Sequence, residues 1–278
     1  MITKELKLKF EDLTEIKKET IKIFENNPPK SKFPKKFNSI FDFEPIEVAR
    51  QLTIISSKNY HKIEKIELIS AKWTKKTEES PNISNMMVFF NNLGSFIQSK
   101  ILDELDLKKR AKIYAFFIDV AVELKKLSEL NLVFSCFSGL NSAAIHRLKF
   151  TKNLINSKKL KQFKEIEELQ STDRNYMNLR DFNNSIQGPN IPYLGIYLTD
   201  LIFIEDGNAS YAPYTNWNKR KLKKNTIESM LKSQNEYYNL VIHEELQKFI
   251  LQEIIEKDFG DDEFYKKSLI VEPRNKKK

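Results

Sequence analysis

The chain has 278 residues, of which 40% are hydrophobic and 31% charged, a balance typical of a globular protein with a sizeable core. Only six residues are glycine, and neither G-x-G-x-x-G nor G-x-x-x-x-G-K-S/T occurs, which argues against kinases, ATPases and dinucleotide-binding enzymes. Three histidines and one cysteine argue against a zinc site. The net charge of +9 indicates a Lys-rich solvated surface, with contact to anionic lipid or nucleic acid as the alternatives; because lysine dominates the basic residues, no nucleic-acid partner is predicted.

The N-terminal segment is predicted to be an amphipathic helix followed by a linker. Apolar side chains recur at helical spacing over residues 2–24, and N-N-P-P at 26–29 breaks the pattern. Residues 30–43 are rich in lysine and are interpreted as a basic linker. We therefore place the domain boundary after residue 42 and expect the N-terminal helix to pack against the domain that follows.

The compartment is predicted to be the cytoplasm. The first ten residues are charged and do not resemble a signal peptide, and the lone Cys136 cannot form an internal disulfide. The longest apolar stretches are interrupted by Asp119 and Asp200, so neither reaches the roughly 20 residues that a bilayer requires.

The rest of the chain has helical periodicity almost throughout. Pro45 fits the first turn of a helix, and Gly188, Gly207 and Gly260 fall at predicted helix ends, where glycine is favoured. No stretch alternates polar and apolar residues, so we predict an all-α fold with little or no sheet. The predicted helices span residues 45–57, 65–72, 82–105, 108–130, 132–139, 142–148, 159–170, 174–186, 193–205, 219–236, 243–255 and 261–268.

Dense basic runs lie at 219–224 and 276–278, and three histidines are spread along the chain. The run K-R-K-L-K-K at 219–224 is interpreted as the solvated face of a helix. His61, His146 and His243 lie on separate predicted elements and in no nucleophile motif. On these grounds alone the sequence indicates a large helical binding module.

Several motifs in a fixed order carry more information. F-E-P-I-E-V-A-R-Q-L-T at 43–53 precedes S-G-L-N-S at 138–142, N-Y-x-x-x-R at 175–180, I-P-Y-L-G-I-Y-L-T-D-L at 191–201 and E-P-R at 272–274. The series resembles the catalytic domain of Ras-family guanine nucleotide exchange factors, the Cdc25-homology or RasGEF domain. The resemblance assigns residues 43–275 to that domain, residues 1–42 to the N-terminal helix and linker, and residues 276–278 to a basic tail.

The resemblance implies a single multi-helix bowl with a protruding helical hairpin that binds a Ras-like small GTPase of the Ras, Rap or Ral type. The hairpin would be inserted beside the nucleotide site and displace the first switch loop, so that GDP leaves without covalent chemistry and without a cofactor. Recruitment to a membrane surface is compatible with this function. The alternative is a catalytically silent GTPase-binding scaffold of the same fold.

The resemblance also implies roles for individual residues. Ile202 and Asp206 are four positions apart and so share a helical face. They match the family's hydrophobic wedge, which occludes the Mg²⁺ position, and its acidic residue, which engages the hydroxyl of the phosphate-binding loop. The family usually has Leu and Glu there; Asp206 is one methylene shorter, and Glu205 is expected to substitute for it in part. Asn141, Tyr176 and Phe134 are expected to contact the second switch of the GTPase.

Residues around the wedge are expected to support the hairpin, namely Tyr193, Leu194, Tyr197, Thr199 and Asp200. Three of the expected site residues also have a purely structural explanation. Asn141 could act only as a helix cap, Tyr176 could be a buried core tyrosine, and Ile202 could belong to a core face.

Many relatives carry an N-terminal exchanger motif, a helical module that braces the hairpin. Residues 1–42 are too few to form it. The sequence is therefore expected to be either a compact exchanger without that module or a fragment.

Overall fold

The computed structural model describes residues 28–74, 77–208, 216–255 and 260–274. This part of the chain is helical and contains no strand ladder, which confirms the predicted all-α class. No helix within it is long and apolar enough to cross a bilayer. Its elements are η2 (Ile40–Asp42), α3 (Pro45–Tyr60), η3 (Lys65–Thr74), η4 (Thr77–Glu79), α4 (Pro81–Leu102), α5 (Leu107–Lys126), α6 (Leu130–Asn141), α7 (Ala143–His146), α8 (Lys149–Asn153), α9 (Ser157–Leu169), α10 (Met177–Ser185), α11 (Leu194–Gly207), α12 (Trp217–Met230), α13 (Glu244–Ile255) and α14 (Asp261–Val271).

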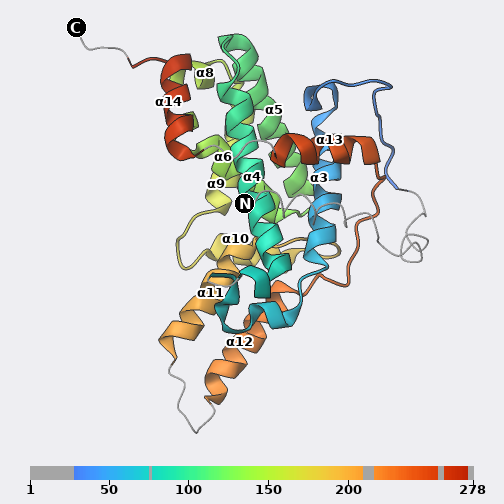
Figure 1. The fold of residues 1–278 in the computed structure, drawn as a ribbon, viewed down its shortest axis with the longest axis vertical. Helices are drawn as coiled ribbons and strands as arrows, with labels where there is room; N and C mark the ends of the chain where they lie inside the picture. Colours follow the sequence, from blue (N-terminus) through green and yellow to red (C-terminus); the bar gives the residue numbers. More distant parts are fainter. Residues whose placement is uncertain (1–27, 75–76, 209–215, 256–259, 275–278) are drawn as a thin grey trace.

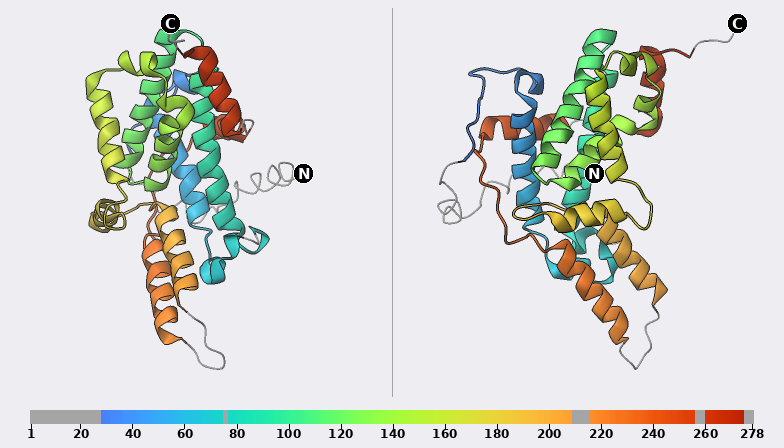
Figure 2. Two further views of the ribbon diagram at one scale, coloured as in Figure 1. Left: turned by 90° about the vertical axis from the view of Figure 1, so that its left-hand side faces the viewer. Right: turned by 180° about the vertical axis from the view of Figure 1, so that it is seen from behind.

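A hairpin of two antiparallel helices, α11 and α12, projects from one end of the molecule (Figures 1 and 2). We call helices α3–α9, α13 and α14 the body. The residues that join α11 to α12, 209–215, lie outside the described residues. The projection means that the hairpin has solvent on most sides, while the body contains the main hydrophobic core.

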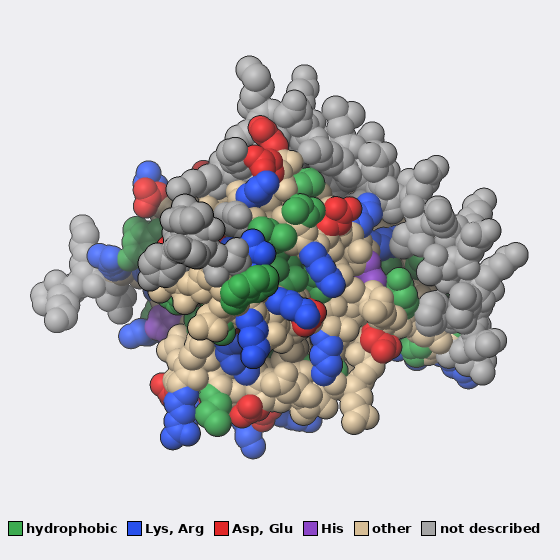
Figure 3. All heavy atoms as spheres, turned by 90° about the horizontal axis from the view of Figure 1, so that it is seen from below, with side chains coloured by type: hydrophobic (Ala, Val, Ile, Leu, Met, Phe, Trp, Pro, Cys, Tyr) green, Lys and Arg blue, Asp and Glu red, His purple; other side chains and the backbone are tan. Residues whose placement is uncertain are grey.

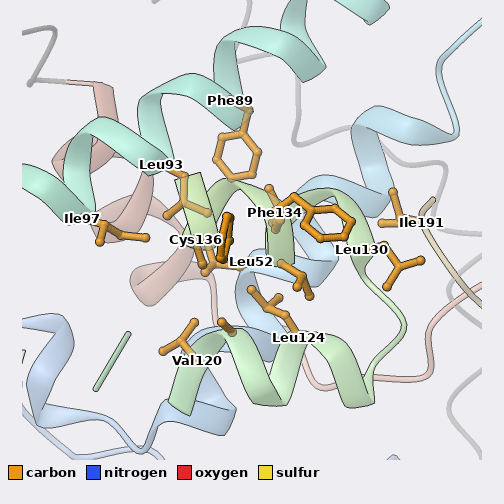
Figure 4. Packing of buried hydrophobic residues seen from close by; sticks show 14 of the residues in the cluster. Leu52, Phe89, Leu93, Ile97, Val120, Leu124, Leu130, Phe134, Cys136 and Ile191 are labelled. Atoms are coloured by element: carbon orange, nitrogen blue, oxygen red, sulfur yellow. The ribbon is translucent and has the colours of Figure 1, made fainter. Parts of the chain in front are cut away.

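The core lies between α3, α4, α5 and α6 (Figure 4). Phe89, Leu93 and Ile97 of α4 recur at the spacing of one helical face and point toward α6. Gly94 of α4 and Gly139 of α6 allow the two backbones to approach closely, because a Cβ atom on Gly139 would lie 2.7 Å from the carbonyl oxygen of Gly94. Gly139, one of the few glycines, is thus needed for packing rather than for a turn.

Residues 30–43, predicted as a linker, instead pack onto the body. Arg50 of α3 donates from Nη1 to the carbonyl oxygen of Lys30, at 3.0 Å. The Phe33 ring lies edge-on to His243 with centroids 4.3 Å apart, and Phe37 contacts Phe249 of α13 at 5.5 Å. Aromatic side chains among the lysines therefore anchor this segment. The helix predicted over residues 2–24 lies outside the described residues.

Two further predictions differ in detail. The segment predicted as a helix over 65–72 is a 3-10 helix, η3, which buries Leu68 and Trp73. The helix predicted over 142–148 is shorter, the four-residue α7, and the separate short helix α8 follows it. Short 3-10 and α-helical turns satisfy the backbone where the chain changes direction around the body.

The last described residues close the body through a buried polar network. Glu272 accepts hydrogen bonds from the amide of Phe150 at 3.1 Å and from the amide and hydroxyl of Thr151 at 2.8 and 2.6 Å. Arg110 of α5 donates from Nε to the Thr151 hydroxyl at 2.9 Å and lies 3.7 Å from the Glu272 carboxylate. We call Arg110, Thr151 and Glu272 the clasp.

Candidate functional site

The hairpin is attached to the body by backbone hydrogen bonds at the start of α6. The amide of Leu130 donates to the carbonyl oxygen of Ile191 at 2.8 Å. The amide of Ile191 donates to the carbonyl oxygen of Ser128 at 3.0 Å. The amide of Leu194, the first residue of α11, donates to the side-chain oxygen of Asn131 at 3.3 Å. These bonds fix the direction in which α11 leaves the body.

A buried carboxyl group, Glu129, lies at this attachment point. Its Oε1 accepts a hydrogen bond from the Ser56 hydroxyl at 2.5 Å, and its Oε2 accepts one from the amide of Leu132, which caps α6. Within the described part of the chain Glu129 forms no ion pair, and burial raises its pKa to about 8. The group is therefore mostly protonated at neutral pH. Glu129 carries no motif in the sequence; its only signal is a glutamate directly before an apolar helix.

Aromatic packing holds the first turn of α11. Tyr193 lies 4.9 Å from Phe134 and 5.9 Å from Phe90, measured between ring centroids. Leu194 and Tyr197 are buried, and the Tyr197 hydroxyl accepts a hydrogen bond from Asn183 at 3.1 Å. Burial raises the pKa of Tyr193 and Tyr197 above the usual tyrosine value, so both hydroxyls stay protonated.

Two expected roles require correction. Phe134 is completely buried beneath Tyr193, so its side chain cannot contact a partner in this conformation and supports the site from below. Thr199 is exposed on α11, so it does not support the hairpin by packing. The reason is the same in both cases: apolar residues occupy every side of these helices, and the sequence does not indicate which side faces the body.

The outer part of α11 carries the predicted wedge and acidic residue. Ile202 is half-buried against the core, and Asp206, one helical turn further on, is exposed. Phe203 is also on this part of the helix and is 69% exposed, a large apolar side chain that the sequence analysis did not single out. An apolar surface followed by a carboxylate therefore lies near the free end of the hairpin.

Glu205 has a different role from the one expected. Its carboxylate accepts a hydrogen bond from Lys219 of α12 at 2.8 Å and is paired with Lys223. Lys219 also donates to the carbonyl oxygen of Glu205 at 2.9 Å. Hydrogen bonds from Lys219 and Lys223 lower the pKa of Glu205. This carboxylate joins α11 to α12 and is already paired, so it does not substitute for Asp206 in this conformation.

The basic run at the start of α12 is therefore only partly solvated. Lys219 is 7% exposed and turns inward to Glu205, while Arg220, Lys221 and Lys224 remain exposed. Seen from the hairpin end, Lys and Arg side chains gather on this face together with hydrophobic ones (Figure 3). Such a face attracts an acidic partner surface.

Asn141 and Tyr176 lie on the body and beside the hairpin, respectively. Asn141 is the last residue of α6 and is half-buried; the residue at the start of α7 is Ser142, so Asn141 is not its N-cap. Asn141 lines a hollow of about 450 Å³ with Ser138 and Gln170. Tyr176 is half-buried and directly precedes α10.

A second hollow lies where α4 meets the start of α11. It has a volume of about 180 Å³ and is lined mainly by apolar side chains, among them Met87, Phe90, Tyr193 and Leu198. Met87 is 40% exposed. The hollow can accommodate an apolar side chain of a partner that contacts the hairpin.

Most of this chain is similar in sequence to known proteins. A family model described as the RasGEF domain matches residues 47–221. Ras guanine nucleotide exchange factor P of Dictyostelium discoideum is 37% identical over 91% of this chain and 17% of that protein. Ras guanine nucleotide exchange factors B and K of the same organism are 35% identical over 86% and 85% of the chain, and over 16% and 15% of those proteins. The chain thus spans less than a fifth of the length of these relatives.

Proposed function

The chain belongs to the RasGEF domain family, and on that premise we propose that it accelerates GDP release from a Ras-like small GTPase by inserting the α11–α12 hairpin beside the nucleotide site. No covalent bond changes in this reaction. The domain binds the nucleotide-free GTPase more tightly than the loaded one, and this difference in binding free energy lowers the barrier to GDP release.

The observation that best supports the proposal is the state of the two carboxylates near the end of α11. Glu205 is paired with Lys219 and Lys223, whereas no hydrogen bond or ion pair to Asp206 occurs among the described residues. A carboxylate that is exposed and unpaired can accept a hydrogen bond from a hydroxyl in a phosphate-binding loop. It also competes with the phosphate and Mg²⁺ for that loop.

Ile202 lies one turn before Asp206, about 5.4 Å along the helix axis. Its half-exposed apolar side chain can occupy the Mg²⁺ position and exclude the water that the ion retains. Together the two residues make the nucleotide site unfavourable for both Mg²⁺ and phosphate.

Contacts outside the hairpin would hold the GTPase in place. Asn141 and Tyr176 are both partly exposed, and the apolar hollow beside Tyr193 lies at the base of α11. We assign these three features to the second switch of the GTPase.

The test is the release of fluorescent GDP from a panel of Ras, Rap and Ral-type GTPases, with and without the domain. Faster release from at least one of them is the expected result. Binding of a nucleotide-free GTPase without faster release would instead identify a catalytically silent scaffold, and absence of both binding and release would contradict the proposal.

A further inference from the structure

An unusual backbone conformation precedes α10. Arg174, Asn175 and Tyr176 have φ angles of 49°, 57° and 58°, so three consecutive residues with side chains adopt the left-handed conformation. This conformation is strained for residues with a Cβ atom, and tertiary contacts must compensate for the strain. The turn places Tyr176 at the start of α10.

One side chain, Arg180, connects this turn to the hairpin. Its Nε donates to the carbonyl oxygen of Asn175 at 2.9 Å. Its Nη2 lies 3.0 and 2.8 Å from the two carboxylate oxygens of Asp200 in α11. Because the guanidinium group is planar and rigid, these bonds fix the carbonyl of the turn relative to the carboxylate of α11.

A second connection runs parallel to the first. Asn183 of α10 donates from Nδ2 to the hydroxyl of Tyr197 in α11 at 3.1 Å. Arg180 and Asn183 are three positions apart on α10, and their partners Asp200 and Tyr197 are three positions apart on α11. The earlier residue of α10 contacts the later residue of α11. Two polar contacts therefore connect α10 to the part of α11 that precedes the wedge.

The two groups connected in this way are both assigned to the partner. Asp200 lies two residues before Ile202 and six before Asp206, and Tyr176 directly precedes α10. Tyr176 is also near enough to Tyr193 to contribute to the raised pKa of that residue. The turn, α10 and α11 thus form one continuous polar and aromatic arrangement.

We infer that Arg180, held by Asp200, is a positioning residue for nucleotide exchange: it fixes the distance and angle between Tyr176 and the Ile202–Asp206 face of α11. The inference rests on the proposed function. Tyr176 and the hairpin can each contact a loaded GTPase separately. The nucleotide-free complex requires both contacts at once, so their fixed relation matters in the release step and less in the first encounter.

The test uses the whole chain and measures GDP release as a function of its concentration. Arg180→Lys keeps the charge but loses the planar donor group, and Asp200→Ala removes the attachment to α11. For both variants we expect the maximal release rate to fall about tenfold, with a change of about twofold or less in the half-saturating concentration. Lys126→Ala, which breaks an exposed ion pair with Glu123 on α5, is the matched control and should leave both quantities unchanged.

Two further readouts separate positioning from general destabilisation. Asp200→Glu restores a carboxylate and should recover part of the rate that Asp200→Ala loses. Tyr176→Ala should reduce the rate less in the Asp200→Ala background than in the unaltered chain, because Tyr176 is then no longer held relative to α11. Fully additive effects, or a rise in half-saturating concentration with an unchanged maximal rate, would contradict the inference.

The outcome also distinguishes the inference from its premise. If the unaltered chain accelerates release from no GTPase of the panel, the proposed function fails and the inference with it. If the unaltered chain is active and both variants reach its maximal rate, only the inference is overturned.

Discussion

The ion pair between Arg110 and Glu272 in the body and the pair between Lys219 and Glu205 in the hairpin have the same chemistry but different surroundings. The side chains of the first pair are 2% and 6% exposed, whereas in the second pair Lys219 is 9% and Glu205 32% exposed, so that only the carboxylate is reached by water. Removing one partner of a buried pair leaves an uncompensated charge in a dry environment, while water can replace a partner at the surface.

The comparison extends to the functions of the two regions. In the body, the clasp and the Gly94–Gly139 contact connect elements that are distant in the sequence and determine the stability of the fold. In the hairpin, the Lys219–Glu205 pair joins α11 to α12 with its carboxylate partly open to solvent, so we expect it to contribute less to stability than the clasp does. Variants of the body should therefore lower the free energy of unfolding, and variants of the hairpin should lower the rate of exchange.

The clasp is expected to give the largest effect. Glu272→Ala removes three hydrogen bonds to Phe150 and Thr151 and leaves Arg110 without its carboxylate. We expect the free energy of unfolding to fall by about 3–5 kcal/mol. Urea unfolding measures this, with Glu165→Gln on the exposed face of α9 as a control that should change stability by at most about 0.5 kcal/mol. A loss of less than about 1 kcal/mol for Glu272→Ala would mean that the clasp does not hold the body together.

The next effect depends on pH and concerns Glu129. Its folded-state pKa of about 8 lies above the usual value, so the unfolded chain releases this proton first as the pH rises. The protonated Glu129 carboxyl therefore contributes to the free energy of unfolding fully below the usual glutamate pKa. This contribution is lost as the pH rises to about 8.

Glu129→Gln should flatten this pH dependence, because the amide does not titrate. Each unit of pKa shift corresponds to about 1.4 kcal/mol, so we expect a difference of about 3 kcal/mol between the two proteins in the change from pH 5 to pH 8. Urea unfolding at a series of pH values provides the measurement. Identical profiles for the two proteins would show that Glu129 is ionised in the folded chain.

The smallest effect in the body concerns the two glycines between α4 and α6. A methyl group on Gly139 would lie 2.7 Å from the Gly94 carbonyl oxygen, whereas one on Gly94 would find its nearest neighbour at 3.5 Å. Gly139→Ala should therefore destabilise the protein by about 1–2 kcal/mol, and Gly94→Ala should be close to neutral because alanine also favours the helix. Thermal melts of the two variants compare them directly, and equal melting temperatures would contradict this description of the helix contact.

The sequence predicted the helical class and the positions of α3, α4 and α5 because their apolar residues repeat on one face. It could not distinguish Phe134, which is buried, from Phe203, which is exposed, because α6 and α11 carry apolar residues on all sides. In such helices the buried side is chosen by tertiary contacts.

The partners of buried polar residues also could not be predicted from the sequence. Lys219 belongs to a basic run that was expected to be solvated, yet it is buried because Glu205 lies across the hairpin from it. Pairs of this kind, like Arg180 with Asp200, join residues from different helices and leave no periodic signal in the sequence. Ile202 and Asp206 could be singled out because they belong to a motif that resembles a known family.

The central claim is that the end of α11 controls the rate of exchange and not the stability of the fold. The most direct measurement combines fluorescent-GDP release by Ile202→Ala and Asp206→Ala, using a GTPase that responds to the unaltered chain, with thermal melts of the same proteins. We expect each variant to slow catalysed release at least about tenfold, equivalent to about 1.4 kcal/mol, with the melting temperature nearly unchanged. Release at the unaltered rate by both variants, or unfolding of Ile202→Ala, would contradict the claim.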